Sequence, residues 1–176
     1  MTPGLDHFLQ RSGGDADADA RAPWQALGTR TNCERLVGQQ LRLRGFQVFD
    51  PRVPSWSWRG GVRRPSARPL FPGHLFLRRE RDRAGALPLL GARGVLGVVP
   101  EREIESIRRV LDALLTPVPH PYVPDGRRVR IRRGPLADVE GFLQDTLAGR
   151  ALLVLSIHLF RHSVAIEIDR ELAALA

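Results

Sequence analysis

Residues 68–77 read RPLFPGHLFL, and this stretch decides the fold. Apolar residues stand on both sides of a Pro-Gly pair, which is a strong turn signal inside a strand pattern. The stretch therefore predicts a strand over 70–78 with a turn within it. Strand alternation places Phe71 and Phe76 on opposite faces. At least one of these two rings is expected in the core, and Phe71 is expected at the surface, although both could simply be core residues.

The segments around this stretch predict an α+β arrangement. Apolar residues recur at helical spacing in two places and alternate in several others. The expected elements are a strand at 24–29, a helix capped by Thr31 or Asn32 that ends at Gly45, strands at 46–53 and 94–99, and a helix over 101–115. Residues 84–90 form a short apolar segment, and 55–68 form a loop or hairpin tip. In the first helix, Cys33, Leu36, Val37 and Leu41 are expected on one apolar face, so Cys33 is interpreted as a core residue rather than a nucleophile.

A proline-rich segment separates this region from the C-terminal part of the chain. Residues 116–125 read TPVPHPYVPD, and a helix interior would tolerate none of these prolines. Short strands are expected beyond it, at 128–133, 139–143, 152–159 and 164–168, which together predict a small all-β module. The Ala-Leu stretches at 147–153 and 172–176 are also compatible with helix.

The charge of the chain is strongly basic and unevenly distributed. All 27 basic residues are arginine, against 19 acids, which gives a net charge of +8 over 176 residues. Residues 22–116 hold seventeen arginines and eight acids, whereas the acidic tract GGDADADA lies within 1–21. This distribution favours a polyanionic partner, with nucleic acid the commonest one. A solvated, arginine-rich surface from a biased genome is the alternative.

No pattern in the sequence indicates catalysis. The single cysteine excludes an internal disulfide framework, and the five histidines lack metal-binding spacing, so no metal, cofactor or catalytic residue is expected. No apolar run is long enough for a membrane span, and residues 1–21 lack the order of a secretory signal. A cytoplasmic binding protein is therefore expected.

Two motifs, in this order, carry a family resemblance. The first is PLFPGHLF at 69–76, followed by Arg-Gly-Val at 93–95, and the second is GRRVRIRRGPLADVEG at 126–141. Together they resemble the NusG family of transcription elongation factors, with the second similar to its KOW motif. The resemblance extends over residues 24–171. It implies an α+β fold: an N-terminal NusG-type (NGN) α/β sandwich linked to a small C-terminal all-β KOW (SH3-like) barrel.

The implied domain boundaries follow the composition of the chain. They are a flexible acidic tail at 1–21, the NGN domain at 22–116, the proline-rich linker at 117–125 and the KOW domain at 126–176. The departures from the family pattern are His74 in place of Tyr, Asp138 where Gly is common, Gly85-Ala86-Leu87 in place of a His-Thr-Thr run, and Phe160-Arg161-His162 in place of a Leu-Gly-Arg turn.

The resemblance also implies partners. Family members bind the clamp helices of the largest RNA polymerase subunit and suppress pausing or termination. This protein is expected to do so as a monomer. By position, the polymerase-binding residues are Phe71, Pro72, His74, Phe76, Ile104 and Ile107. The PLFPGHLF and SVAIEID segments and the acidic tail favour a specialised RfaH-like antitermination paralogue over the housekeeping protein.

Specialised paralogues also contact the non-template DNA strand, which by position implies Arg30, Gln40, Arg44 and Arg93, although these could be ordinary solvated side chains. The KOW domain recruits either termination factor Rho or a small-subunit ribosomal protein, here through Leu159 and Phe160.

Two further interpretations remain open at this stage. The tip at 56–64 reads WSWRGGVRR, where Trp56 and Trp58 share one face if the segment is extended. Aromatic rings beside arginines are typical of a single-strand binder, but the tryptophans could instead pack against the domain. The alternative for the whole chain is a ribosome-associated RNA-binding KOW protein, which would have no need for an aromatic FPG patch.

Overall fold

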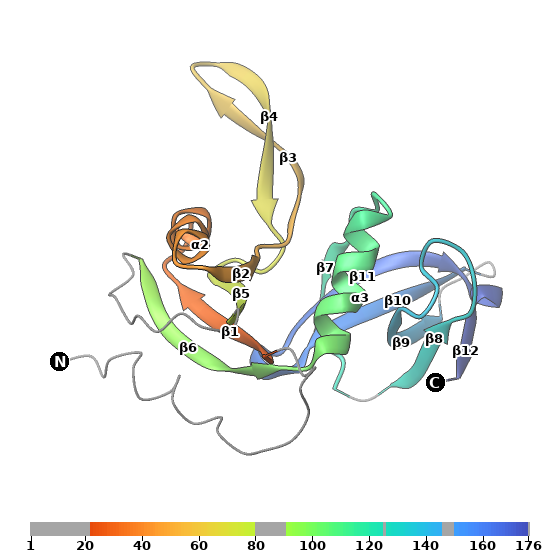
Figure 1. The fold of residues 1–176 in the computed structure, drawn as a ribbon. Helices are drawn as coiled ribbons and strands as arrows, with labels where there is room; N and C mark the ends of the chain where they lie inside the picture. Colours follow the sequence, from red (N-terminus) through yellow and green to blue (C-terminus); the bar gives the residue numbers. More distant parts are fainter. Residues whose placement is uncertain (1–21, 80–90, 125, 146–149, 176) are drawn as a thin grey trace, which may run out of the picture. The chain divides into compact units, whose positions relative to one another are not determined.

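A computed structural model describes residues 22–79, 91–124, 126–145 and 150–175 (Figure 1). Its contacts divide the described chain into two units, the first made of residues 22–50, 71–79 and 91–98, and the second of residues 51–70 and 99–175. The expected tail at 1–21 and the apolar segment at 84–90 lie outside the described residues. The domain boundaries expected from the sequence remain a prediction.

The first unit is built on a four-stranded sheet with the order β2-β5-β1-β6. Its strands are β1 (Trp24–Thr29), β2 (Phe46–Phe49), β5 (His74–Arg79) and β6 (Ala92–Val99). Strand β5 pairs antiparallel with both β1 and β2, so the segment that follows the Pro-Gly pair lies inside the sheet. The strand expected at 24–29 is confirmed residue for residue.

Helix α2 (Glu34–Leu43) contacts β2 and β5 and closes the core of this unit. The core contains Leu27, Val37, Leu41, Leu75 and Leu77, with Cys33 packed against it as expected. The expected cap is wrong, because Cys33 occupies the N-cap position and no side chain caps the helix. Leu36 was expected on the apolar face but is 43% exposed.

Two expected strands have different limits in the structure. The strand predicted over 46–53 is two strands, β2 and β3, separated at Asp50 and Pro51. The strand predicted over 70–78 begins only at His74, because Gly73 takes a φ of 79° and the His74 N–H donates to the Phe71 carbonyl at 3.1 Å. Phe71 therefore lies in a turn and does not take part in the strand alternation.

The second unit contains a hairpin, a helix and a sheet. The hairpin joins β3 (Arg52–Arg59) to β4 (Val62–Pro69) and forms a two-stranded sheet of its own. Helix α3 (Glu101–Asp112) ends three residues earlier than expected, with Leu114 in a left-handed conformation at φ 57°. It packs against two strands of the C-terminal sheet.

The C-terminal sheet is all-β, as expected, with the order β12-β8-β9-β10-β11-β7. The strands are β7 (Val118–His120), β8 (Arg127–Ile131), β9 (Glu140–Asp145), β10 (Arg150–Ile157), β11 (His162–Asp169) and β12 (Ala173–Leu175), with short 3-10 turns at His158–Phe160 and Arg170–Leu172. Strand β7 lies within the segment that was expected to be a linker. It pairs with β11 although Pro119 lies within it, which is permitted because β7 is an edge strand of the sheet.

Two departures from the family pattern occupy left-handed backbone positions. Asp138 stands where Gly is common and has φ 66°, and Arg161 stands where the family has Gly and has φ 54°. The chain therefore keeps a backbone that favours glycine while it places charged side chains there. Gly141 has a different requirement: a Cβ at this position would lie 2.7 Å from the Val154 carbonyl oxygen in β10.

Candidate functional site

The turn at Phe71–His74 lies over an aromatic cluster. The Phe71 and Phe76 rings meet edge to face with their centroids 5.9 Å apart, and Phe49 lies 6.0 Å from Phe76. Phe71 is 1% exposed and Phe76 is 0% exposed. The expectation that Phe71 displays its ring at the surface is therefore wrong, because this ring completes the cluster.

Glu34 holds this turn in place. Its side chain is fully buried in the first turn of α2, and its Oε1 accepts a hydrogen bond from the Gly73 N–H at 2.7 Å. The Gly73 carbonyl accepts from the Thr29 N–H at 2.8 Å, so the turn is bonded to both α2 and the end of β1. Sequence analysis missed Glu34, since an acid in the first turn of a helix usually indicates only a favourable interaction with the helix dipole.

The structure places the six expected polymerase-binding residues in two environments. Pro72 is exposed and His74 is half-buried, and its Nδ1 lies 3.0 Å from the Pro72 carbonyl oxygen. The other four are buried: Phe71, Phe76, Ile104 and Ile107. Pro72 and His74 are thus the members of this set that solvent reaches.

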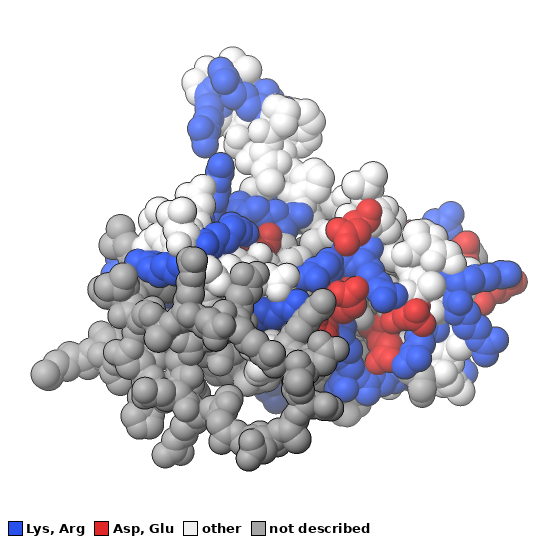
Figure 2. All heavy atoms as spheres, in the orientation of Figure 1, with Lys and Arg blue, Asp and Glu red and all other residues white. Residues whose placement is uncertain are grey.

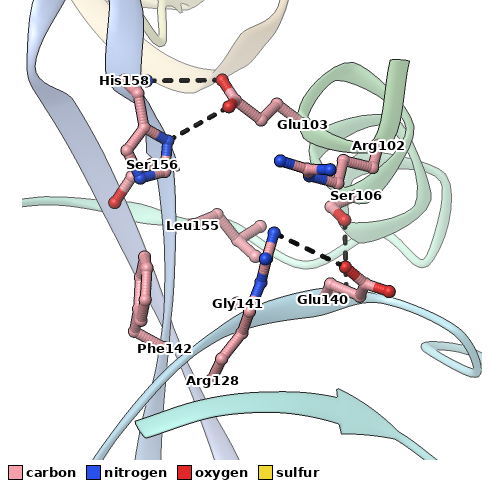
Figure 3. A pocket seen from close by; sticks show the side chains of 10 residues that line it. All are labelled: Arg102, Glu103, Ser106, Arg128, Glu140, Gly141, Phe142, Leu155, Ser156 and His158. Atoms are coloured by element: carbon pink, nitrogen blue, oxygen red, sulfur yellow. Dashed lines mark hydrogen bonds and ion pairs between the residues drawn. The ribbon is translucent and has the colours of Figure 1, made fainter. Parts of the chain in front are cut away.

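Polar contacts join α3 to the C-terminal sheet (Figure 3). Glu103 accepts from the His158 backbone N–H at 3.3 Å and lies 3.1 Å from Nδ1 of the same residue. The Glu140 N–H donates to the Ser106 hydroxyl at 3.2 Å. The side chains of this region surround a small hollow that Arg128 and Phe142 also line. Every one of these bonds joins residues far apart in the sequence, so sequence analysis could not anticipate them.

The four residues expected to contact DNA all lie in the first unit. Arg30 and Arg93 are exposed; Arg30 directly follows β1, and Arg93 lies in the neighbouring strand β6. The Arg30 N–H donates to the Gly91 carbonyl just before β6, and a Cβ at Gly28 in β1 would lie 3.5 Å from that of Arg93. Gln40 and Arg44 are half-buried on α2, where the Arg44 guanidinium donates to the Gln40 carbonyl at 3.4 Å.

The expected partner site of the C-terminal sheet is accessible. Leu159 is 40% exposed in the short turn between β10 and β11, and Phe160 is half-buried beside His162, with ring centroids 5.2 Å apart. The left-handed Arg161 follows Phe160 and keeps the turn tight.

The β3–β4 hairpin is a basic, exposed feature of the described chain. It carries five arginines and no acid, and it shows only blue and white spheres in Figure 2. Trp56 is 57% exposed and Trp58 is 72% exposed, so the reading in which these tryptophans pack against the domain is wrong.

Among the residues that the structure describes, no three His, Cys, Asp or Glu side chains gather to hold a metal ion. Within the same ranges, the helices are too short or too polar to cross a membrane.

Comparison with known proteins gives a consistent result. The family described as transcription termination factor nusG matches residues 22–114. The transcription termination/antitermination protein NusG of Pseudomonas aeruginosa is 25% identical over 158 residues, which cover 81% of this chain and 89% of that protein. NusG of Escherichia coli K12 is 26% identical over 136 residues, covering 70% and 74%. A solved structure that describes domain interaction in Thermotoga maritima NusG aligns over 88% of this chain and 97% of that chain, with 16% identity and a TM-score of 0.43.

Fold and family match together define the class of the molecule. It is a transcription termination/antitermination factor with a NusG N-terminal domain of helices and sheets and a C-terminal all-β region. The chain belongs to the NusG family, a family of transcription factors rather than enzymes.

Proposed function

We propose that this protein is an elongation factor that binds RNA polymerase through its N-terminal domain and suppresses pausing or termination, as a specialised RfaH-like antitermination paralogue. The observation that carries the proposal is the family match over residues 22–114, which includes the PLFPGHLF turn. The proposed target is the pair of clamp helices in the largest polymerase subunit.

The exposure of the turn residues determines which of them can contact the clamp helices first. Pro72 and His74 are open to solvent, whereas Phe71, Phe76, Ile104 and Ile107 are buried. The first contact with the clamp helices therefore falls on Pro72 and His74. Apolar contact through the four buried side chains requires that they become accessible as the complex forms.

A capture experiment tests this proposal. Purified RNA polymerase is captured by the immobilised full chain at about 0.15 M salt, which limits non-specific arginine binding. His74→Asp and Phe71→Ala are both expected to reduce capture, with His162→Ala as a matched control at an exposed histidine of the C-terminal sheet. Circular dichroism melts of each variant separate loss of binding from loss of fold.

Because His74→Asp changes an accessible side chain, this variant still tests docking through the turn if Phe71→Ala fails to fold. Undiminished capture by folded His74→Asp would contradict docking through this turn.

We also propose that Arg30, Gln40, Arg44 and Arg93 contact the non-template DNA strand. Two exposed arginines support this, Arg30 at the end of β1 and Arg93 in the neighbouring strand β6, since guanidinium groups bind phosphates well. Arg30→Ala together with Arg93→Ala is expected to weaken binding of polymerase complexes that carry a transcription bubble more than binding of free polymerase. Equal losses on both would contradict the DNA contact.

The C-terminal sheet is proposed to recruit either Rho or a small-subunit ribosomal protein through Leu159 and Phe160. The exposure of Leu159 beside a half-buried aromatic ring supports this, because such rings anchor interfaces. Binding of each purified candidate to the wild type and to Leu159→Ala distinguishes them. Binding that is the same for both chains would place the contact elsewhere.

A further inference from the structure

The β3–β4 hairpin has two chemically different faces. Residues opposite each other on antiparallel strands share a face, and the register pairs Trp56 with Pro65 and Trp58 with Arg63. The tryptophan face therefore holds both indoles and Arg63. The opposite face holds the remaining polar side chains of the outer hairpin: Ser55, Ser57, Arg59, Arg64, Ser66 and Arg68.

On the tryptophan face, one arginine lies over the ring of one tryptophan and across the strands from the other. The Arg63 guanidinium lies 4.4 Å from the centroid of the Trp56 ring, while Arg63 stands directly across from Trp58. Trp56 and Trp58 are two positions apart along β3, a distance of about 6.8 Å along the strand. One cation is thus held beside two accessible aromatic surfaces.

Exposure and charge together indicate a kind of partner. Large exposed apolar rings that are rimmed by polar groups mark interaction sites. Here the rim is entirely cationic, because residues 52–69 contain five arginines and no acid. A partner that offers flat apolar surfaces and negative charge matches both features, and unpaired nucleotides offer both.

The side chains on the tryptophan face favour DNA over RNA. A protein distinguishes RNA by hydrogen bonds with the 2′-hydroxyl group. Apart from the guanidinium and indole N–H donors, this face offers only apolar groups and no side-chain acceptor for the hydroxyl proton: Arg52, Pro54, Trp56, Trp58, Arg63, Pro65, Ala67 and Pro69. Such a face suits stacking that tolerates any base.

We propose that the β3–β4 hairpin binds single-stranded DNA, with Trp56 and Trp58 stacking on unpaired bases and Arg63 neutralising an adjacent phosphate. Arg59, Arg64 and Arg68 on the opposite face add attraction for the backbone. This inference rests on the proposed function, in which the protein works beside an open transcription bubble. The hairpin is distinct from the set formed by Arg30, Gln40, Arg44 and Arg93.

The test is a direct titration of the full chain without polymerase. The probes are a fluorescein-labelled 15-nucleotide oligo-dT, an oligo-rU of equal length and a duplex of equal length, at about 0.15 M salt. Anisotropy gives the dissociation constant. Quenching of tryptophan fluorescence gives a second readout, since Trp24 is fully buried and the other two of the three tryptophans lie in the hairpin.

Truncation of the rings is expected to weaken binding of oligo-dT. The double variant Trp56→Ala/Trp58→Ala loses about tenfold or more in affinity, because each stacked base is worth roughly one tenfold step or more. Trp56→Phe/Trp58→Phe keeps an aromatic surface and loses less. Leu175→Ala removes another exposed apolar side chain, 68% exposed in β12, and leaves binding unchanged.

Several outcomes would overturn the proposal. These are absence of oligo-dT binding by the wild type, unchanged affinity in the folded alanine variant, and tighter binding of oligo-rU or duplex. Loss of polymerase capture by the alanine variant without any oligo-dT binding would make the hairpin a protein contact instead. A failure in the titration leaves capture through His74 intact, so the two proposals fail separately.

Discussion

The Phe71–His74 turn and the β3–β4 hairpin both contain aromatic residues near turn glycines, yet the rings are buried in the turn and exposed in the hairpin. In the turn, Phe71 and Phe76 are buried, and the backbone is bonded to α2 and β1. In the hairpin, Trp56 and Trp58 are exposed on a two-stranded sheet. Strand alternation therefore does not apply to Phe71, which lies in a turn, whereas it holds for Trp56 and Trp58 in β3. What decides exposure is whether other elements supply partners for the ring.

The largest expected difference comes from truncating one ring in each region. Phe76→Ala removes a fully buried ring and is expected to lower the free energy of unfolding by about 3–5 kcal/mol. Trp58→Ala removes an exposed ring and is expected to change it by less than about 0.5 kcal/mol. Urea unfolding followed by circular dichroism measures both. Similar losses of unfolding free energy in the two variants would contradict the difference in burial between the turn and the hairpin.

The next effect concerns the carboxylate that fixes the turn. Glu34→Ala removes the acceptor of the Gly73 N–H and leaves a half-buried donor unpaired, which costs about 1–3 kcal/mol. Glu34→Gln keeps an oxygen acceptor, and it is expected to lose less. The same unfolding measurement applies, with Glu101→Ala at the exposed start of α3 as the control. If glutamine is as damaging as alanine, the charge matters rather than the hydrogen bond.

A smaller effect is expected at the tip of the hairpin. Gly60 and Gly61 have φ values of 59° and 76°, the conformation of a two-residue hairpin turn that favours glycine at both positions. Gly61→Ala is expected to destabilise the hairpin locally by about 1–2 kcal/mol. A Cβ there meets no atom within 4 Å, so the cost is backbone strain alone. Amide hydrogen exchange should accelerate in β3 and β4 and stay unchanged in β1.

The smallest effect is expected from an exposed ion pair in the C-terminal sheet. A hydrogen bond and the negative charge of Glu167, 2.5 Å away, raise the pKa of Arg150 above its already high ordinary value. A raised pKa gives stability that is present below the unfolded-state pKa and is lost only as pH rises through the folded-state value. Arg150→Gln is therefore expected to shift the melting temperature very little, and by the same amount at about pH 6 and pH 9. A shift at one of these pH values only would contradict this account.

Local patterns predicted much of the fold. The limits of β1 and the start of α3 follow from alternation and helical spacing within a few residues. Strands β8, β9, β10 and β11 of the C-terminal sheet follow in the same way, whereas β7 and β12 were not predicted. The family resemblance was confirmed by the family match over residues 22–114, a range that includes PLFPGHLF.

Long-range contacts account for what the sequence could not show. Glu34 and Gly73 are 39 residues apart, and nothing near Glu34 indicates that its carboxylate accepts from a distant backbone group. The pairing of β7 with β11 lies in a segment whose prolines favoured a linker. The burial of Phe71 depends on neighbours brought together by the sheet, so a surface turn was the reasonable but wrong expectation.

The length of the hairpin has a consequence of its own. Each strand has eight residues, which at about 3.3 Å per residue gives the ribbon a span of roughly 26 Å. An arm of that length separates the proposed DNA-binding side chains near its tip from residues 51 and 70, where the chain enters and leaves the hairpin. The number of residues in the arm thus sets the distance between a partner held at the tip and one held at its base.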